Sequence, residues 1–133
     1  MSAQVSLSLA EEFLAAAQSA LEAGRPNAAA SAAVHAAICA TDAVCEELTG
    51  DHPVSKAHDQ SVDALKQACR NTRHSKAAMC HARQLSAVLA VKSLAEYGRR
   101  ALQLAQARRA VTQAARFVEW AREVVLGSHG PAA

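Results

Sequence analysis

The segment PNAAASAAVHAAICATDAVCEELT, residues Pro26–Thr49, decides the fold that we predict for this chain. Its proline stands where the first turn of a helix tolerates one, and Gly50 follows where a left-handed residue ends a helix. The segment therefore predicts one helix of about six or seven turns. Alanine is its commonest residue, at nine of 24 positions. Because such small side chains let neighbouring helices approach closely, we expect this segment to be the central helix of the domain.

Two faces of this helix differ in polarity. At about 100° per residue, one face gathers mostly apolar side chains, namely Val34, Ile38, Thr41, Cys45 and Leu48. The adjoining polar stripe consists of Ser31, His35, Cys39, Asp42 and Glu46. We expect the stripe to enter or flank a packed interface, with His35 and Asp42 lining one cleft. The alternative is that each of these two side chains is hydrogen-bonded across a helix interface, because buried polar groups need partners.

The composition favours close-packed helices in one domain. The chain has 133 residues, enough to bury a core, and only four aromatic side chains. Its four cysteines include no Cys-x-x-Cys pair, which argues against a disulfide framework. The N-terminus does not resemble a secretion signal, and no stretch approaches the ~20 uninterrupted apolar residues of a membrane span. We therefore expect a cytoplasmic protein with reduced cysteines and no membrane contact.

The flanks of the central segment predict helices as well. The capping-box pattern Ser8-Leu9-Ala10-Glu11 marks the start of a first helix over residues 9–23. Because Arg25 is nearly the whole connection to the central helix, the two should form an antiparallel hairpin. After the central helix, residues 50–55 have turn chemistry and include a proline, which forbids a continuous helix.

Three further helices are predicted beyond this turn. A short one begins at Lys56 or Asp59 and ends at Cys69, followed by an interruption at residues 71–72. A long one spans Ser75–Tyr97, where Gly98 ends it, and the last begins between residues 99 and 104 and ends at Leu126. Since no strand-like alternation is visible, we predict an all-α antiparallel bundle of four long helices plus one short helix. It forms a single domain over residues 1–133, with a flexible tail from about residue 127.

Charge is divided unevenly along the chain. The net charge is +2, yet residues 1–69 carry 3 Lys and Arg against 9 Asp and Glu, and residues 70–133 carry 11 against 3. On the last predicted helix, Arg109 and Arg116 stand opposite an apolar seam. That seam consists of Ala107, Val111, Ala114, Val118, Ala121 and Val125. The basic half is suited to attract an anionic partner or the acidic half of a second subunit; the alternative is a solvated surface with internal ion pairs.

Taken together, these segments resemble the HEPN family of small helical domains. The resemblance covers nearly the whole chain. It is carried by GRPNAAASAAVHAAICATDAV (24–44), SKAHDQSVDALKQA (55–68), VKSLAEYG (91–98) and AARFVEWA (114–121). It implies an α-helical bundle that usually dimerises, with the second and fourth long segments contributing to a cleft at the dimer axis. It also implies work with RNA or nucleotides, and a partner such as an antitoxin or a nucleotidyltransferase-like protein.

A catalytic subset of this family cleaves RNA without a metal and is marked by an Arg, four to six residues and a His. The matching position here is Lys92-Ser93-Leu94-Ala95-Glu96-Tyr97, which keeps the spacing but not the chemistry. Such cleavage needs a base of near-neutral pKa and a fixed guanidinium. A tyrosine hydroxyl, with an ordinary pKa near 10, is a poor base at neutral pH, whereas Lys92 is still able to contact a phosphate. We therefore expect no robust ribonuclease activity from Lys92 and Tyr97.

Other histidine patterns are less promising. Arg122 and His129 have the family spacing, but His129 falls in the predicted tail, where a site geometry is not held. His35 and Cys39 have the spacing of half a metal site, yet no second pair converges on them in the sequence, so we predict neither a metal nor another cofactor.

The leading hypothesis is a cytoplasmic HEPN-like homodimer that binds RNA, a nucleotide or another anionic ligand, or regulates a partner protein, without robust catalysis. The candidate ligand-binding residues are His35, Asp42, Lys92, Glu96, Tyr97, Arg109 and Arg116. One alternative is a metal-independent ribonuclease toxin of a toxin–antitoxin or defence system. Another is a purely structural protein–protein interaction module. The few aromatic side chains argue against extensive base stacking.

Overall fold

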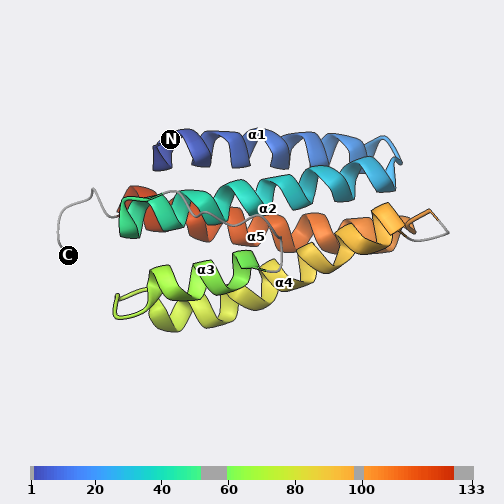
Figure 1. The fold of residues 1–133 in the computed structure, drawn as a ribbon. Helices are drawn as coiled ribbons and strands as arrows, with labels where there is room; N and C mark the ends of the chain where they lie inside the picture. The colour runs from blue at the N-terminus through green and yellow to red at the C-terminus, as the bar shows by residue number, and fades with distance from the viewer. Residues whose placement is uncertain (1, 52–59, 98–100, 128–133) are drawn as a thin grey trace.

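A computed structural model describes residues 2–51, 60–97 and 101–127, without the side chains of residues 95–97. All regular structure within these ranges is helical, which confirms the predicted all-α class. The elements are α1 (Ala3–Glu22), α2 (Pro26–Thr49), α3 (Gln60–Cys69), α4 (Ser75–Tyr97) and α5 (Leu104–Gly127). In Figure 1 the long helices α1, α2, α4 and α5 run in alternating directions along the molecule.

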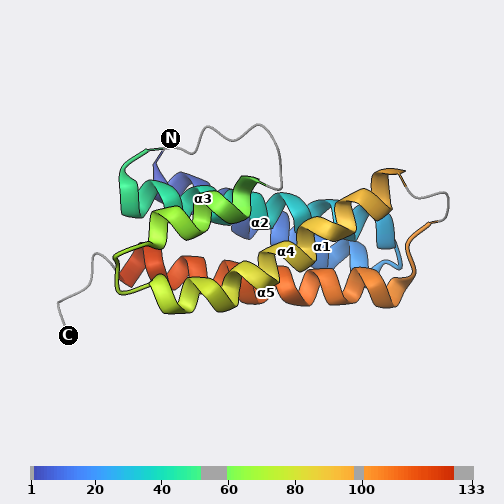
Figure 2. The same cartoon turned by 60° about the horizontal axis from the view of Figure 1, so that its bottom comes forward.

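The central position of α2 is confirmed, because α2 contacts α1, α3, α4 and α5. Figures 1 and 2 show α1 and α2 as one hairpin, with α3 and α4 on the other side of the molecule and α4 crossing α5 obliquely. Alanines on several sides of α2 have no solvent exposure, among them Ala29, Ala33, Ala36, Ala37, Ala40 and Ala43. A methyl group is small enough for two helix axes to approach closely. Alanine on nearly every side therefore allows α2 to pack against this many helices.

The ends of α2 follow the sequence signals. Pro26 occupies the first helical position, and Gly50 ends the helix with a φ of 80°. The Gly50 N–H donates to the carbonyl of Glu46 at 2.9 Å, which satisfies one of the free carbonyls of the last turn. Asn71, with a φ of 63°, makes the predicted interruption between α3 and α4.

The predicted start of the first helix was wrong, because α1 begins at Ala3 and not near Leu9. The N-cap is Ser2, whose Oγ accepts a hydrogen bond from the Val5 N–H at 3.2 Å. The additional turns are stabilised by burial, because a small apolar cluster joins them to α2 and α5. That cluster contains Ala3, Leu7, Ala43 and Val125. The capping-box pattern at Ser8 therefore lies inside a helix that begins earlier.

The other helices agree with the predicted bounds where the structure describes them. α3 ends at Cys69 and α4 spans Ser75–Tyr97 as predicted, while α5 includes Gly127, one residue past the predicted end. Residues 56–59, Gly98 and the tail after residue 127 lie outside the described residues. All six residues of the predicted α5 seam are buried, which confirms that face of α5.

One described helix, α2, is long and apolar enough to span a membrane by length and composition, although no such segment was expected. Its most apolar window is 61% buried within the protein. The same apolar composition is needed by a helix with neighbours on several sides, so α2 fits the role of a core helix.

Candidate functional site

The polar stripe of α2 passes from solvent into the core. Ser31 and His35 are exposed, Cys39 and Asp42 are half-buried, and Glu46 is buried. The His35 Nδ1–H donates to the carbonyl of Ser31 at 2.8 Å, and its ring lies 5.2 Å from the ring of Phe13 on α1. One ring nitrogen of His35 is thus hydrogen-bonded within α2 itself. Asp42 lies two turns further along the same helix.

The buried end of the stripe joins α1 to α2. The Ser6 hydroxyl lies 3.1 Å from each carboxylate oxygen of Glu46 and donates to that carboxylate. Ser6 is 2% exposed and Glu46 is 7% exposed, so both side chains are largely shielded from water. A buried carboxylate requires such donors. Glu46 therefore has a structural role that was not predicted, because Ser6 was expected to precede the first helix.

The cysteines provide no nucleophile in the core. All four are free. Burial, with a smaller effect of the nearby Asp42 charge, raises the pKa of Cys45 to about 12. Burial likewise raises the pKa of Cys69 to about 11, so both thiols are protonated at neutral pH. Among the described residues, no group of three or more His, Cys, Asp and Glu side chains is placed to hold a metal ion.

His81 is part of the packing between α4 and α5. Its imidazole stacks on the indole of Trp120, with ring centroids 4.5 Å apart and planes 13° from parallel. Its Nδ1–H donates to the Gln84 Oε1 at 2.7 Å. Trp120 also contacts the ring of Phe117, at a centroid distance of 5.8 Å. These contacts give His81 a structural function without any ligand.

The predicted candidate catalytic position, residues 92–97, is described only in part. Lys92 is half-buried near the C-terminal end of α4, and the side chains of Glu96 and Tyr97 lie outside the described residues. His129 lies outside them as well. Arg122 of α5 is exposed and its Nη1 lies 3.1 Å from the Glu11 Oε1 of α1, so this arginine pairs with a carboxylate of the same chain.

The outer side of α5 presents three arginines around a shallow hollow of about 430 Å³. We call it the arginine face and define it by Ala105, Arg108, Arg109, Thr112, Gln113 and Arg116. The three arginines are exposed, and the buried seam occupies the opposite side of the same helix. Arg109 and Arg116 were predicted to point outward; Arg108, Thr112 and Gln113 were missed, although their helical spacing places them on the same side.

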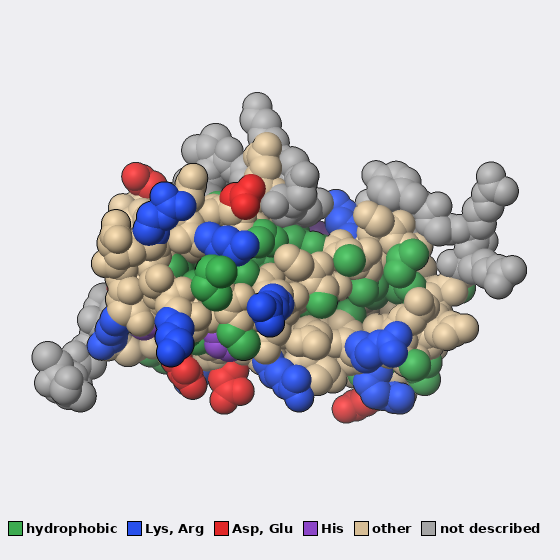
Figure 3. Space-filling view, turned by 90° about the horizontal axis from the view of Figure 1, so that it is seen from below, with side chains coloured by type: hydrophobic (Ala, Val, Ile, Leu, Met, Phe, Trp, Pro, Cys, Tyr) green, Lys and Arg blue, Asp and Glu red, His purple; other side chains and the backbone are tan. Residues whose placement is uncertain are grey.

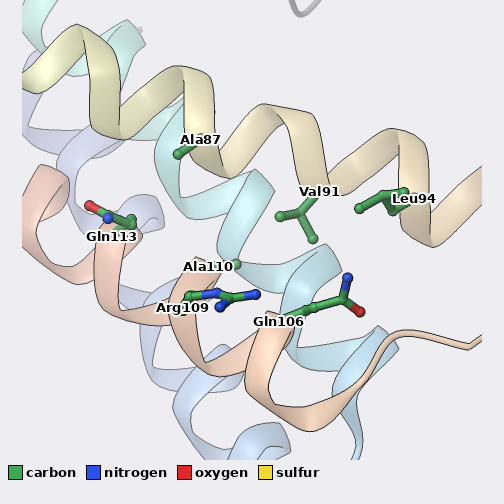
Figure 4. Close-up of a pocket in the computed structure, with 7 residues that line it drawn as sticks. All are labelled: Ala87, Val91, Leu94, Gln106, Arg109, Ala110 and Gln113. Carbon is green, nitrogen blue, oxygen red and sulfur yellow. The ribbon is translucent and has the colours of Figure 1, made fainter.

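A second hollow lies between α4 and α5 and has a volume of about 220 Å³. Figure 4 shows its lining, with three side chains from α4 facing four from α5. We call it the α4/α5 groove; its lining consists of Ala87, Val91, Leu94, Gln106, Arg109, Ala110 and Gln113. Arg109 and Gln113 belong to both hollows, so the groove and the arginine face are continuous.

The face that contains α4 is rich in positive charge. Figure 3 shows Lys and Arg side chains spread over this side, with apolar side chains between them and acidic ones toward the edges of the view. The segments α1 and α2, in contrast, contain several acidic residues and no Lys or Arg. The charge division along the sequence thus becomes a division between helices.

Comparison with known proteins gives no family assignment, because neither a family model nor a curated protein matches this chain.

Proposed function

We propose that this protein is an HEPN-like antiparallel helical bundle that forms a homodimer and binds RNA or a similar polyanion through the arginine face, without robust catalysis. The observation that carries the proposal is the hollow on α5, where three exposed guanidinium groups occur within nine residues. None of the described residues that line it is acidic. Arginine suits such a surface because its planar group binds phosphate through two parallel hydrogen bonds.

Contacts to phosphates, not stacking on aromatic rings, account for this binding. The two aromatic side chains of α5, Phe117 and Trp120, are buried in the core and do not offer a stacking surface. A surface whose contacts are mainly between arginine and phosphate has little preference for RNA sequence, and its affinity falls as the salt concentration rises. A small anionic ligand such as a nucleotide would contact the same arginines at fewer points. A protein partner that binds the arginine face would need an acidic surface, because the face is positively charged.

The binding test compares one pair of arginine variants with a matched pair. The binding of a short single-stranded RNA is measured by fluorescence anisotropy. We expect the logarithm of the association constant to fall linearly with the logarithm of the salt concentration. The double variant Arg109→Glu/Arg116→Glu should weaken binding by about tenfold at low salt, and loss of two phosphate contacts should make the salt slope shallower by roughly 1 to 1.5.

The control is Arg70→Glu/Arg73→Glu, which changes the net charge equally. Both of its arginines are exposed and lie in the connection between α3 and α4, at the opposite end of the molecule from the start of α5 (Figure 1). The control should retain most of the affinity. Equal losses in the two double variants would show that only net charge matters, and no binding at low salt would leave the interaction-module hypothesis.

The ribonuclease alternative is tested in the same samples. Lys92 offers a point charge in place of a guanidinium, and a tyrosine at position 97 is a poor base. The RNA should therefore stay intact during long incubation with a chelator. Cleavage that Lys92→Ala or Tyr97→Phe abolishes would support the ribonuclease toxin, and with it a search for an antitoxin or a nucleotidyltransferase-like partner.

Dimerisation is the second testable part of the proposal. The resemblance places the dimer cleft beside the second and fourth long helices, which here are α2 and α5, so two copies would bring two arginine faces into one assembly. Many alanines of α2 are buried within the single chain, whereas exposed apolar side chains such as Met79 of α4 are available for contact with a second copy. Light scattering at micromolar concentration should give twice the chain mass of 13.9 kDa. A monomer mass would contradict this part.

A further inference from the structure

The α4/α5 groove has a chemical character that differs from that of the arginine face beside it. Its walls are mostly apolar, and Leu94 on its rim is 50% exposed, which leaves apolar surface in contact with water. Two amides, those of Gln106 and Gln113, and one guanidinium, that of Arg109, are the polar groups in the lining. Apolar walls with a few polar groups are the usual composition of a small-molecule site.

Small residues at facing positions keep this groove open. Ala87 lies on the α4 side and Ala110 on the α5 side, so a short side chain lines the groove on each helix (Figure 4). The oblique crossing of α4 over α5 adds to the separation (Figure 2). The volume of about 220 Å³ is below the range of about 300–1,000 Å³ for drug-sized ligands, so the groove suits one small group.

Because the two hollows are continuous, one ligand could place a small group in the groove and its neighbouring atoms at the arginine face. Arg109 and Gln113 line both, so a ligand in the groove would have its neighbouring atoms at the arginines. A nucleic acid strand has this alternation, because each anionic phosphate is followed by a base with apolar faces and polar edges. An amide both donates and accepts hydrogen bonds, which matches the mixed edge of a base. A duplex would not fit, since its bases are paired and stacked.

We propose that the α4/α5 groove binds one unpaired base of a single-stranded nucleic acid whose adjoining phosphates contact the arginine face. This inference rests on the proposed function and makes it more specific: Arg109 joins the phosphate contacts to the base, Gln106 and Gln113 contact the base edge, and Val91 and Leu94 cover its faces. Because the polar contacts come from two glutamines, which can reorient, we expect a preference for single strands and little preference among bases.

The test compares strands that differ only in their bases. A uridylate oligonucleotide and an abasic ribose-phosphate strand of equal length carry the same charge, so the arginine face treats them alike. We expect the uridylate strand to bind about fivefold more tightly, which corresponds to about 1 kcal/mol. A duplex of the same length should also bind less tightly per phosphate than the uridylate strand.

Two tryptophan variants on α4 locate the effect. Ala87→Trp fills the groove from its rim, where position 87 is exposed and the larger side chain does not disturb the core. It should lower the affinity for the uridylate strand to that for the abasic strand. Ala90→Trp, at another exposed position of α4 outside the groove lining, is the matched control and should keep the fivefold preference.

The outcomes separate this inference from the proposed function. Equal binding of the uridylate and abasic strands by the unmodified protein, or a preference that survives Ala87→Trp, overturns the groove assignment while salt-dependent binding at the arginine face stands. Failure of both strands to bind at low salt overturns the two proposals together. Polyglutamate of the same charge that binds as tightly as the uridylate strand would assign the surface to an acidic protein partner and overturn the nucleic acid assignment.

Discussion

Replacement of Phe117 by alanine is expected to lower the free energy of unfolding by about 3–5 kcal/mol. Phe117 has no solvent exposure and is the largest fully buried side chain in the part of the chain that the structure describes. Its ring contacts that of Trp120, which in turn stacks on His81 of α4. The truncation removes buried apolar surface and leaves a cavity that the surrounding side chains fill only in part, so both terms destabilise the fold.

Urea unfolding followed by circular dichroism measures this loss, provided that the transition is two-state. Leu126→Ala is a suitable control, because Leu126 lies on the same helix and is 45% exposed. Leu126→Ala should lower the free energy of unfolding much less than Phe117→Ala does. A loss below about 1 kcal/mol for Phe117→Ala would mean that the surroundings collapse onto the vacated space or that the ring is not in the core.

The sequence predicted the helices well where the signals are local. Pro26, Gly50 and Asn71 impose their backbone preferences without help from distant residues, so the ends they mark were found. The start of α1 was missed because a cap pattern at Ser8 resembles a helix start, and the choice of Ser2 is made by packing of Leu7 against α2 and α5. Tertiary contacts therefore decided the boundary that local chemistry left open.

The candidate site was predicted in part for the same reason. Arg109 and Arg116 follow from periodicity alone, because the apolar seam fixes the opposite side of α5. The α4/α5 groove does not follow from periodicity, since it depends on the angle at which two helices cross and on Ala87 and Ala110 lying at facing positions. The burial of Glu46 likewise depends on Ser6, which is distant in sequence.

The dense alanine packing of α2 leads to the second large effect, which is expected for Ala37→Leu. Ala37 has no solvent exposure on a helix with four neighbours. Leucine is nearly as good a helix former as alanine, so a change in stability reports packing and not helix propensity. Three additional carbon atoms have to displace a neighbouring helix or adopt a strained rotamer, at a cost of about 1–3 kcal/mol.

The same substitution at Ala28 provides the control, because that residue lies on the same helix and is exposed. Ala28→Leu should change the free energy of unfolding by no more than about 0.5 kcal/mol. Urea unfolding of the two variants side by side therefore measures how tightly the helices close around α2. If Ala37→Leu were as stable as Ala28→Leu, the axes around α2 would have room to separate, and alanine would not be the reason that α2 lies at the centre of the fold. If only Ala37→Leu is destabilised, close approach of the neighbouring helices to α2 contributes to the stability of the fold.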